Sequence, residues 1–294
     1  WHRRHDGHWY ETAPPDHPEF VTSWFLRTKE LIDKYSPDLL YFDDTELPFG
    51  DVGLAIAAHL YNTNIKAHGR LEAVLNSKGL RPDHVGTMVL DIERGLADRI
   101  LPDAWQTDTC IGDWHYKRSL FEQHKYKSAA TVINMLIDII SKNGNLLLNI
   151  PLRGNGEIDA DEHKVLTDLA SWVPAHGEAI YGTRPFTVFG EGPTDVKGSS
   201  NFNEKQKRPY GAQDIRFTAK GNTVFAFGLG WPENGKMVIK SLSRGNAAYP
   251  GEVGRVDLVG GDRLDFTRDA NGLNVTLPEK RPGTYPFAVK ITPA

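Results

Sequence analysis

The stretch Leu39-Leu40-Tyr41-Phe42-Asp43-Asp44 is a short apolar run that ends in two acidic residues. A run of this kind is typical of a strand buried on both faces of a parallel sheet, with polar side chains following at its carboxyl end. Apolar residues before it, from Phe20 to Tyr35, recur at helical spacing, and Ser36-Pro37 predicts the end of that helix. The sequence therefore predicts a helix that leads into a buried strand.

The alternation of helix and strand patterns continues to about Ala175. We expect further helices over Val52–Tyr61, Ala129–Ile140 and Asp161–Val173, and strands over Asn64–Ala67, Gly86–Leu90, Trp105–Cys110 and Asn145–Ile150. This alternation predicts a parallel sheet, either doubly wound or closed as a barrel. We count about five strand–helix units, whereas a closed (β/α)8 barrel needs eight. A sheet of the barrel type would therefore be incomplete.

The pattern changes beyond Tyr181, where turn-forming residues cluster in Phe189-Gly190-Glu191-Gly192-Pro193. Short runs with a period of two follow at Ile215–Thr218, Val224–Leu229, Lys236–Ser241, Arg255–Val259, Leu264–Arg268, Leu273–Leu277 and Phe287–Ile291. Their spacing of about 8–12 residues predicts an antiparallel β-sandwich. We expect two domains: a partial (β/α)8-type barrel over residues 1–185 and a β-sandwich over residues 186–294.

Composition excludes several classes of protein. Of the 294 residues, 39% are hydrophobic and 24% are charged, which is typical of a globular chain. The net charge of −4 and the lack of a long Lys/Arg run argue against nucleic-acid binding. No apolar run approaches the ~18–20 residues that a membrane span requires. The single cysteine, Cys110, excludes an internal disulfide and a cysteine-rich zinc site but does not fix the compartment.

Candidate reactive residues follow from the rule that ligands bind at the carboxyl ends of parallel strands. The rule selects Asp43, Asp44, Asp91, Glu93 and the stretch Trp105–Asp108. Carboxylates on different strands near tryptophans suit glycosidic bond cleavage, which needs one ionised carboxylate and one protonated carboxyl group. The alternative is that these acids cap helices and pair with Arg94 and Arg99. Spacing alone leaves both interpretations open.

A metal site is not predicted. His2, His5 and His8 lie three residues apart, but Gly7 stands between them and no fourth ligand follows, so a solvated loop is the better interpretation. Cys110 follows an expected strand, and we expect it to be a small buried apolar residue. We therefore expect neither a metal nor an organic cofactor.

Several motifs resemble those of one enzyme family. The stretch Tyr35–Asp43 resembles the nucleophile strand of the α-L-fucosidases, the retaining enzymes of glycoside hydrolase family 29. Further blocks resembling that family occur at Trp105–Thr109, Gly112–Trp114, Asp138–Ile150, Gly154–Ile158, Ala179–Pro185, Asp214–Thr218, Val224–Leu229 and Trp231-Pro232. They occur in order and cover nearly the whole chain, so the set is far more specific than any single block.

The resemblance implies two catalytic residues. Asp43 corresponds to the attacking aspartate, with the adjacent Asp44 as the alternative. Glu93, at the end of a later strand, corresponds to the general acid/base, with Asp91 as its rival. In the double displacement that the family uses, Asp43 would attack the anomeric carbon and Glu93 would protonate the leaving oxygen.

The resemblance also implies residues that bind the sugar. Arg70 resembles an arginine that contacts fucose near the nucleophile, although it could equally be a surface residue of a loop. Trp114 and Trp105 are expected to stack on the sugar or to fill the mouth of the barrel. Tyr41 is expected to contact the substrate from the nucleophile strand.

The implied substrate is a fucosylated oligosaccharide or glycoconjugate, with neither nucleic acid nor membrane as a partner. We expect a secreted or periplasmic location and leave lysosomal or cytoplasmic locations open. Only 42 residues precede Asp43, and the first strands of the family's barrel have no counterpart among them. We expect either a homo-oligomer or a missing N-terminal barrel segment to supply them. The alternatives are a catalytically silent carbohydrate-binding or assembly module, and another retaining glycosidase.

Overall fold

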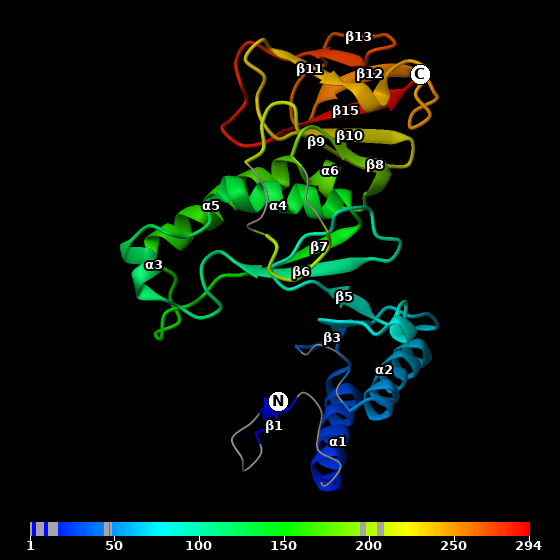
Figure 1. The fold of residues 1–294 in the computed structure, drawn as a ribbon, viewed down its shortest axis with the longest axis vertical. Helices are drawn as coiled ribbons and strands as arrows, with labels where there is room; N and C mark the ends of the chain where they lie inside the picture. Colours follow the sequence, from blue (N-terminus) through cyan, green and yellow to red (C-terminus); the bar gives the residue numbers. More distant parts are fainter. Residues whose placement is uncertain are drawn as a thin grey trace. The chain divides into compact units, whose positions relative to one another are not determined.

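The computed structural model describes residues 17–43, 47, 49–194, 198–204 and 209–294, together with the backbone of residues 2–3 and 9–10. Asp44 and the side chains of His2, His5 and His8 lie outside the described residues. The chain forms two compact units, Trp1–Ile92 and Glu93–Ala294, which are described separately (Figure 1). The boundary predicted at residue 185 lies inside the second unit.

The described part of the first unit contains three parallel strands and two long helices. Its elements are the short pair β1 (His2–Arg3) and β2 (Trp9–Tyr10), then α1 (Pro18–Tyr35), β3 (Leu39–Phe42), α2 (Asp51–His68), β4 (Val74–Ser77), the 3-10 turn η1 (Pro82–His84) and β5 (Val89–Asp91). Strand β4 pairs in parallel with β3 on one side and β5 on the other. Ile32 of α1, Ile56 and Leu60 of α2, and Leu75 of β4 form the buried core between helices and sheet.

The strand predicted at Asn64–Ala67 is wrong, because those residues form the last turns of α2. Helical spacing continues through the buried Ile56 and Leu60, and the Asn64 side chain accepts the backbone N–H groups of Glu72 (2.7 Å) and Ala73 (3.1 Å). The actual strand β4 was missed because it spans only four residues and buries the polar Asn76 and Ser77.

The second unit begins with another parallel pair of strands and its helices. Its first elements are β6 (Trp105–Cys110), α3 (Arg118–Glu122), α4 (Ala129–Ser141), β7 (Gly144–Asn149), α5 (Ala160–Ala175) and α6 (Gly177–Ile180). Strands β6 and β7 run parallel, with Trp105 opposite Gly144 and Cys110 opposite Asn149. The helices and strands predicted here are confirmed to within two residues at each end.

The rest of the second unit is antiparallel. It comprises β8 (Arg184–Glu191), β9 (Ile215–Lys220), β10 (Thr223–Gly228), β11 (Lys236–Ile239), the 3-10 turn η2 (Lys240–Leu242), β12 (Val253–Leu258), β13 (Phe266–Arg268), β14 (Leu273–Thr276) and β15 (Phe287–Pro293). The strands form a five-stranded sheet in the order β12-β15-β10-β9-β8 and a three-stranded sheet in the order β11-β14-β13. The prediction of a partial (β/α)8-type barrel followed by an antiparallel β-sandwich is confirmed.

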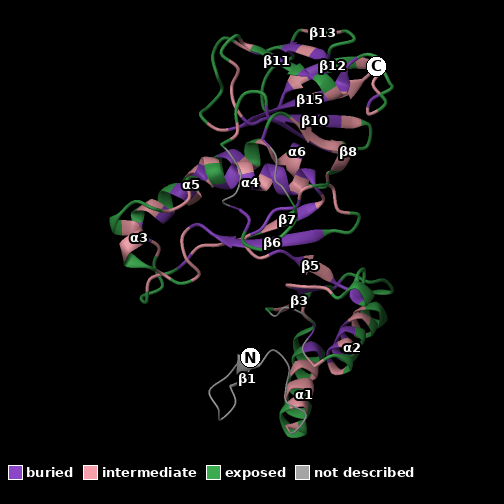
Figure 2. Cartoon of the chain, viewed as in Figure 1, coloured by how far each residue is buried: buried purple, intermediate pink, exposed green. Residues whose placement is uncertain are grey.

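The five-stranded sheet is buried on both faces (Figure 2). On one face, Phe217 and Val289 pack in the core shared with the three-stranded sheet. On the other, Phe225 and Phe227 pack against α4 and α5, where Ile137 and Trp172 meet them. This second core joins the sandwich to the helices of the parallel part, so the two form one packed body.

The last residues of strand β8, Phe189–Glu191, were predicted as part of a turn, because Gly190 was interpreted as a turn residue. A Cβ atom at Gly190 would lie 2.4 Å from the carbonyl oxygen of Ile215 on the neighbouring strand. Gly190 is therefore needed for close strand contact rather than for a turn. The pairing of β8 with β9 also shifts register between Pro185 and Gly190, which hides the period-two pattern.

A buried ionic network connects α4 to the sandwich. The Asp138 carboxylate accepts hydrogen bonds from Lys142 Nζ (2.9 Å) and Arg216 Nε (2.7 Å), and all three side chains are at most 1% exposed. Lys142 Nζ also donates to the carbonyl of Ala97 (2.8 Å), and Arg216 donates to the carbonyl of Thr194 (3.0 Å). Each buried cation therefore has both a charged partner and a carbonyl partner.

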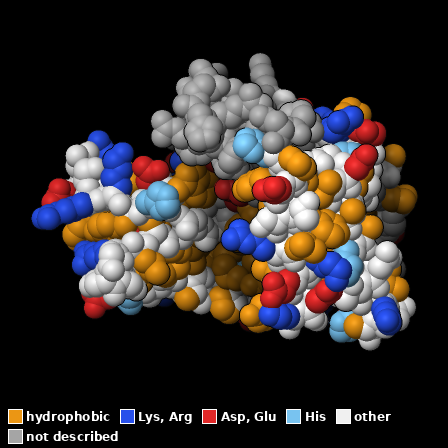
Figure 3. All heavy atoms as spheres, turned by 90° about the horizontal axis from the view of Figure 1, so that it is seen from below, with side chains coloured by type: hydrophobic (Ala, Val, Ile, Leu, Met, Phe, Trp, Pro, Cys, Tyr) orange, Lys and Arg blue, Asp and Glu red, His pale blue; other side chains and the backbone are white. Residues whose placement is uncertain are grey.

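Apolar side chains are also found on the surface. In the described part of the first unit, the exposed large ones include Phe20, Leu26, Leu31 and Tyr35 of α1. Figure 3 shows such apolar side chains lying between charged ones on the face that it presents. Among the described residues, no helix combines the length and apolar character that a membrane crossing needs.

Asp138→Asn should lower the free energy of unfolding by about 3–5 kcal/mol, because it leaves two buried cations without their counter-charge. Urea denaturation of the purified chain measures the difference. Glu178→Gln is the control, since Glu178 forms an ion pair with Lys290 while 45% exposed, and its removal should cost at most about 1 kcal/mol. Equal effects of the two substitutions would contradict the structural role of the network.

Candidate active site

Three charged residues lie side by side at the carboxyl ends of the strands in the first unit. Strand register pairs Phe42 with Ser77 and Ser77 with Leu90. The residues that follow are Asp43, Lys78 and Asp91, so they stand at the same level on three neighbouring strands. We refer to these three residues as the charged row.

The charged row is held together by the lysine. Lys78 Nζ lies 3.5 Å from Oδ1 of Asp43 and 3.5 Å from Oδ1 of Asp91. The Asp43 side chain is 74% exposed, whereas that of Lys78 is 10% exposed and that of Asp91 is fully buried. The ammonium group offsets the cost of burying the Asp91 charge and stabilises the negative charge of both carboxylates. The row therefore presents an accessible anionic oxygen at the sheet edge.

Tyr41 belongs to the same edge of the sheet. It lies two residues before Asp43 on β3, so its side chain is on the same face of the strand. Its half-buried ring lies 5.8 Å from Lys78 Nζ, measured to the ring centroid. Of the residues predicted to contact substrate, Tyr41 is the one placed beside Asp43 in the first unit.

Asp91 is unsuited to the acid role for which it was the rival. A general acid must be protonated when the substrate binds. The Asp91 side chain is fully buried beside Lys78, so its carboxyl group is closed to solvent and to the leaving oxygen of a substrate. We therefore assign Asp91 as the buried partner of Lys78.

Glu93 is the first residue of the second unit, and its backbone is held by two hydrogen bonds. Its N–H donates to Oδ1 of Asn201 (3.0 Å), and its carbonyl accepts the N–H of Phe202 (2.8 Å). The Glu93 residue as a whole is half-exposed. Asp43 belongs to the first unit and Glu93 to the second, so the surroundings of each residue are described within its own unit.

Trp114 is fixed in the loop that follows β6. Its carbonyl accepts Nδ2 of Asn149 (3.1 Å), the last residue of β7, and its N–H donates to Oδ1 of Asp113 (2.9 Å). The Arg94 guanidinium lies 5.8 Å from the centroid of its half-buried ring. Trp114 thus lies at the carboxyl end of this strand pair.

Glu204 was missed by the sequence reasoning. Its buried carboxylate accepts hydrogen bonds from Arg94 Nε (3.0 Å), the Thr109 hydroxyl (2.7 Å) and Lys127 Nζ (3.1 Å). Burial alone would raise the pKa of the Glu204 carboxyl, but Thr109, Lys127 and Arg94 together hold that pKa below its ordinary value. The residue lies in the loop between two sandwich strands, about 110 residues from Arg94, and no motif pointed to it.

Two predicted substrate contacts are contradicted by the structure. Arg70 follows the end of α2 and precedes β4, so it lies at the amino end of that strand, opposite the charged row, where its Nε donates to Glu72 (2.7 Å). Trp105 is 1% exposed, its Nε1 donates to the carbonyl of Lys142 (2.9 Å), and a Cβ at Gly144 would lie 2.5 Å from its ring. Trp105 therefore has no ring face open to a sugar.

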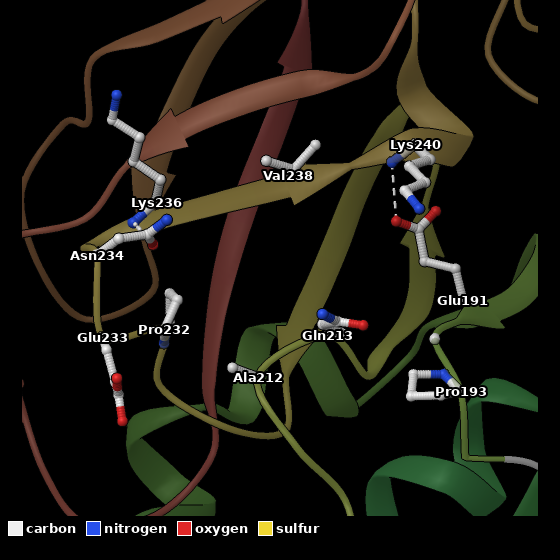
Figure 4. Close-up of a pocket in the computed structure, with 11 residues that line it drawn as sticks. Glu191, Pro193, Ala212, Gln213, Pro232, Glu233, Asn234, Lys236, Val238 and Lys240 are labelled. Carbon is white, nitrogen blue, oxygen red and sulfur yellow. Dashed lines mark hydrogen bonds between the residues drawn. The ribbon is translucent and has the colours of Figure 1, made fainter.

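A groove of about 730 Å³ with mixed polar and apolar lining lies elsewhere, in the sandwich (Figure 4). Its lining includes Gln213, Asn234, Lys236 and Glu191. The Glu191 carboxylate accepts the backbone N–H groups of Lys240 (2.8 Å) and Ser241 (2.7 Å), so it stabilises the start of η2. The described residues contain no cluster of three or more His, Cys, Asp or Glu side chains suited to a metal ion.

Known proteins resemble this chain over nearly its whole length. The tissue alpha-L-fucosidase of Rattus norvegicus is 27% identical over 90% of this chain and 54% of its own length. The tissue alpha-L-fucosidase of Homo sapiens is 26% identical over 93% of this chain and 56% of its own length. The crystal structure of Thermotoga maritima alpha-fucosidase in complex with fucose superimposes with a TM-score of 0.68 at 25% identity, over 93% of this chain and 57% of that one.

The chain spans about half the length of the curated relatives it matches. Two family models match it in sequence order. The alpha-L-fucosidase model covers residues 1–178, and the model of the alpha-L-fucosidase C-terminal domain covers residues 208–292. The first model alone covers more than half of the chain and includes Asp43, Glu93 and Trp114. The chain therefore belongs to the alpha-L-fucosidase family.

Proposed function

We propose that this chain carries the catalytic carboxylates of a retaining α-L-fucosidase that hydrolyses terminal α-L-fucose from oligosaccharides or glycoconjugates. The observation that supports this most is the charged row, in which an exposed aspartate stands beside an ammonium group at the carboxyl edge of a parallel sheet. Family membership and the fucose-bound Thermotoga maritima relative support the choice of sugar.

In the first step, an oxygen of Asp43 attacks the anomeric carbon of fucose, and the bond from that carbon to the leaving oxygen breaks. Glu93 donates its proton to the departing oxygen, so that an alcohol leaves rather than an alkoxide. Asp43 loses its negative charge when the ester forms. Lys78 then still has the buried carboxylate of Asp91 as its partner, 3.5 Å away, so the reaction does not leave the ammonium group unpaired.

In the second step, the Glu93 carboxylate takes a proton from a water molecule as that water attacks the anomeric carbon. The ester bond to Asp43 breaks, and its carboxylate regains the negative charge that Lys78 stabilises. The two inversions give net retention, and they require the carboxyl groups to approach to about 5–5.5 Å in the working enzyme.

Trp114 and Tyr41 are the aromatic residues that we propose for sugar recognition. Each residue is half-buried, so part of it is exposed to solvent. Each also lies at the carboxyl end of the strands of its own unit. An aromatic face next to a cation suits a sugar, because the ring packs on C–H groups while nearby charged groups bind hydroxyls. Arg94 beside Trp114 and Lys78 beside Tyr41 provide these charges.

Asp43→Gly should lower kcat for an aryl α-L-fucoside by at least about 10³-fold, because the attacking atom is removed. Added azide should restore turnover and yield β-L-fucosyl azide, since only one inversion then takes place. Release of nitrophenol and analysis of the product measure both effects in the full chain. Asp38→Gly is the matched control, because Asp38 lies just before the opposite end of the same strand and is exposed. Turnover that persists unchanged in Asp43→Gly would contradict the assignment.

Lys78→Met should lower kcat/KM by about 10²-fold, because it removes the charge that stabilises the nucleophile. It should also destabilise the fold by about 3–5 kcal/mol, since Asp91 then keeps a buried charge without its cation. The double variant Lys78→Met/Asp91→Asn should recover much of that stability but none of the activity. Lys66→Met, on the exposed surface of α2, is the control. Recovery of activity together with stability would show that Lys78 is only structural.

A further inference from the structure

Residues 198–204, which we call the clamp segment, run beside residues 93–98 in the second unit. Leu96 and Ser200 form an antiparallel bridge. Asn203 binds both polar groups of the Leu96 backbone, accepting its N–H (2.7 Å) and donating to its carbonyl (3.0 Å). Further along, the Ser199 hydroxyl accepts the N–H of Asp98 (3.1 Å) and donates to its carboxylate (2.9 Å). The clamp segment thus pairs with the residues that follow Glu93 along their length.

The pairing extends to Glu93 itself and to Arg94. Asn201 and Phe202 take up the N–H and the carbonyl of Glu93, and the N–H of Glu204 donates to the carbonyl of Arg94 (3.1 Å). Arg94 has a φ of +46°, a conformation that costs a non-glycine residue free energy and persists where its surroundings enforce it. The polar backbone groups around Glu93 are therefore bonded on both sides of an unfavourable turn.

The Glu204 side chain secures the same turn by a second route. Its carboxylate is hydrogen-bonded to Arg94, and it is itself anchored by Lys127, which precedes α4, and by Thr109 of β6. Lys127 Nζ also donates to the carbonyl of Cys110 (2.6 Å). The Arg94 side chain, which follows Glu93 directly, is thus fixed to the parallel strands through one buried carboxylate from the sandwich loop.

We propose that the clamp segment, through Asn201 and Glu204, is the positioning element for the proton donor Glu93. The proposal rests on the assignment of Glu93 as the general acid/base. With its backbone fixed on both sides, Glu93 has only its side-chain torsions left to adjust. A misplacement of about 1 Å can lower a catalysed rate by about 10²-fold, so the precision of this anchoring bears on proton transfer. The segment lies between β8 and β9, and it gives the sandwich a part in catalysis.

The test compares two aryl fucosides whose leaving groups differ in their need for a proton. 4-Nitrophenolate leaves readily without protonation, whereas phenolate depends on a general acid. Asn201→Ala and Glu204→Gln should lower kcat/KM for phenyl α-L-fucoside by about 10²-fold and for 4-nitrophenyl α-L-fucoside by less than about 5-fold. Glu93→Gln should show the same selectivity more strongly. Equal losses on both substrates, or no loss, would overturn the proposal while leaving the fucosidase assignment in place.

Matched controls exist in the same unit. The Asn246 side chain also accepts a backbone N–H, that of Ala248 (2.9 Å), and Glu191 also binds several backbone and side-chain donors. Asn246→Ala and Glu191→Gln should leave the ratio of the two kcat/KM values unchanged. A changed ratio in these controls would mean that any disturbance of the sandwich produces the effect, which would overturn the specific role of the clamp segment.

Amide hydrogen exchange tests the anchoring without turnover. In Asn201→Ala and Glu204→Gln, the amides of residues 93–98 should exchange at least about 10-fold faster, because the first variant removes the acceptor of the Glu93 N–H and the second weakens the anchor of the Arg94 side chain, so that the segment opens more often. In Asn246→Ala they should not change. Unchanged protection of residues 93–98 in both clamp variants would overturn the proposal. A wild-type chain that hydrolyses neither fucoside would contradict the proposed function instead, and the exchange result would still decide whether the clamp segment anchors Glu93.

Discussion

The second unit depends on the buried ion pairs that the Asp138 carboxylate forms with Lys142 and Arg216. It neutralises Lys142 on its own helix and Arg216 on a sandwich strand, and Lys142 in turn holds the carbonyl of Ala97. Breaking such a pair leaves an unpaired buried charge, which lowers the stability of the fold by several kcal/mol. The network therefore favours the single arrangement of helix, strand and loop in which all of its charges are paired. That arrangement brings the loop between β8 and β9 against residues 93–98. Residues 93–98, which include Glu93, are thus bonded both to Lys142, through the carbonyl of Ala97, and to residues 198–204.

In the first unit, the arrangement of the charged residues depends on strand register. Parallel pairing places Asp43, Lys78 and Asp91 at one level, and burial then divides their roles. The fully buried Asp91 keeps Lys78 in place, and Lys78 meets the exposed Asp43. A single lysine therefore connects a buried carboxylate to the exposed one that we propose as the nucleophile. In the proposed function, solvent exposure decides which of the two chemically identical aspartates can react with a substrate.

The helices, most strands and the position of Asp43 could be predicted because each depends on local pattern, namely apolar periodicity and an acid after a buried run. Arg70 was misplaced because the last turns of α2, which contain Asn64 and Lys66, were interpreted as a strand, and this put the arginine at a carboxyl strand end instead of before β4. Trp105 was misinterpreted because its neighbours in sequence do not reveal that Gly144, on the adjacent strand, leaves space in which its ring is buried. Lys78 and Glu204 could not be predicted, since their roles come from register and from a contact across about 110 residues.

The central claim is that Asp43 forms a covalent bond to the sugar, and trapping that bond tests it most directly. A 2-deoxy-2-fluoro fucosyl fluoride reacts at the nucleophile, and its fluorine slows hydrolysis of the resulting ester. Peptide mass spectrometry of the inactivated chain should place one fluorofucosyl group on Asp43, and Asp43→Gly should remain unlabelled while Asp38→Gly is labelled like the wild type. A label on Asp44, on Asp91 or on any other carboxylate would contradict the account.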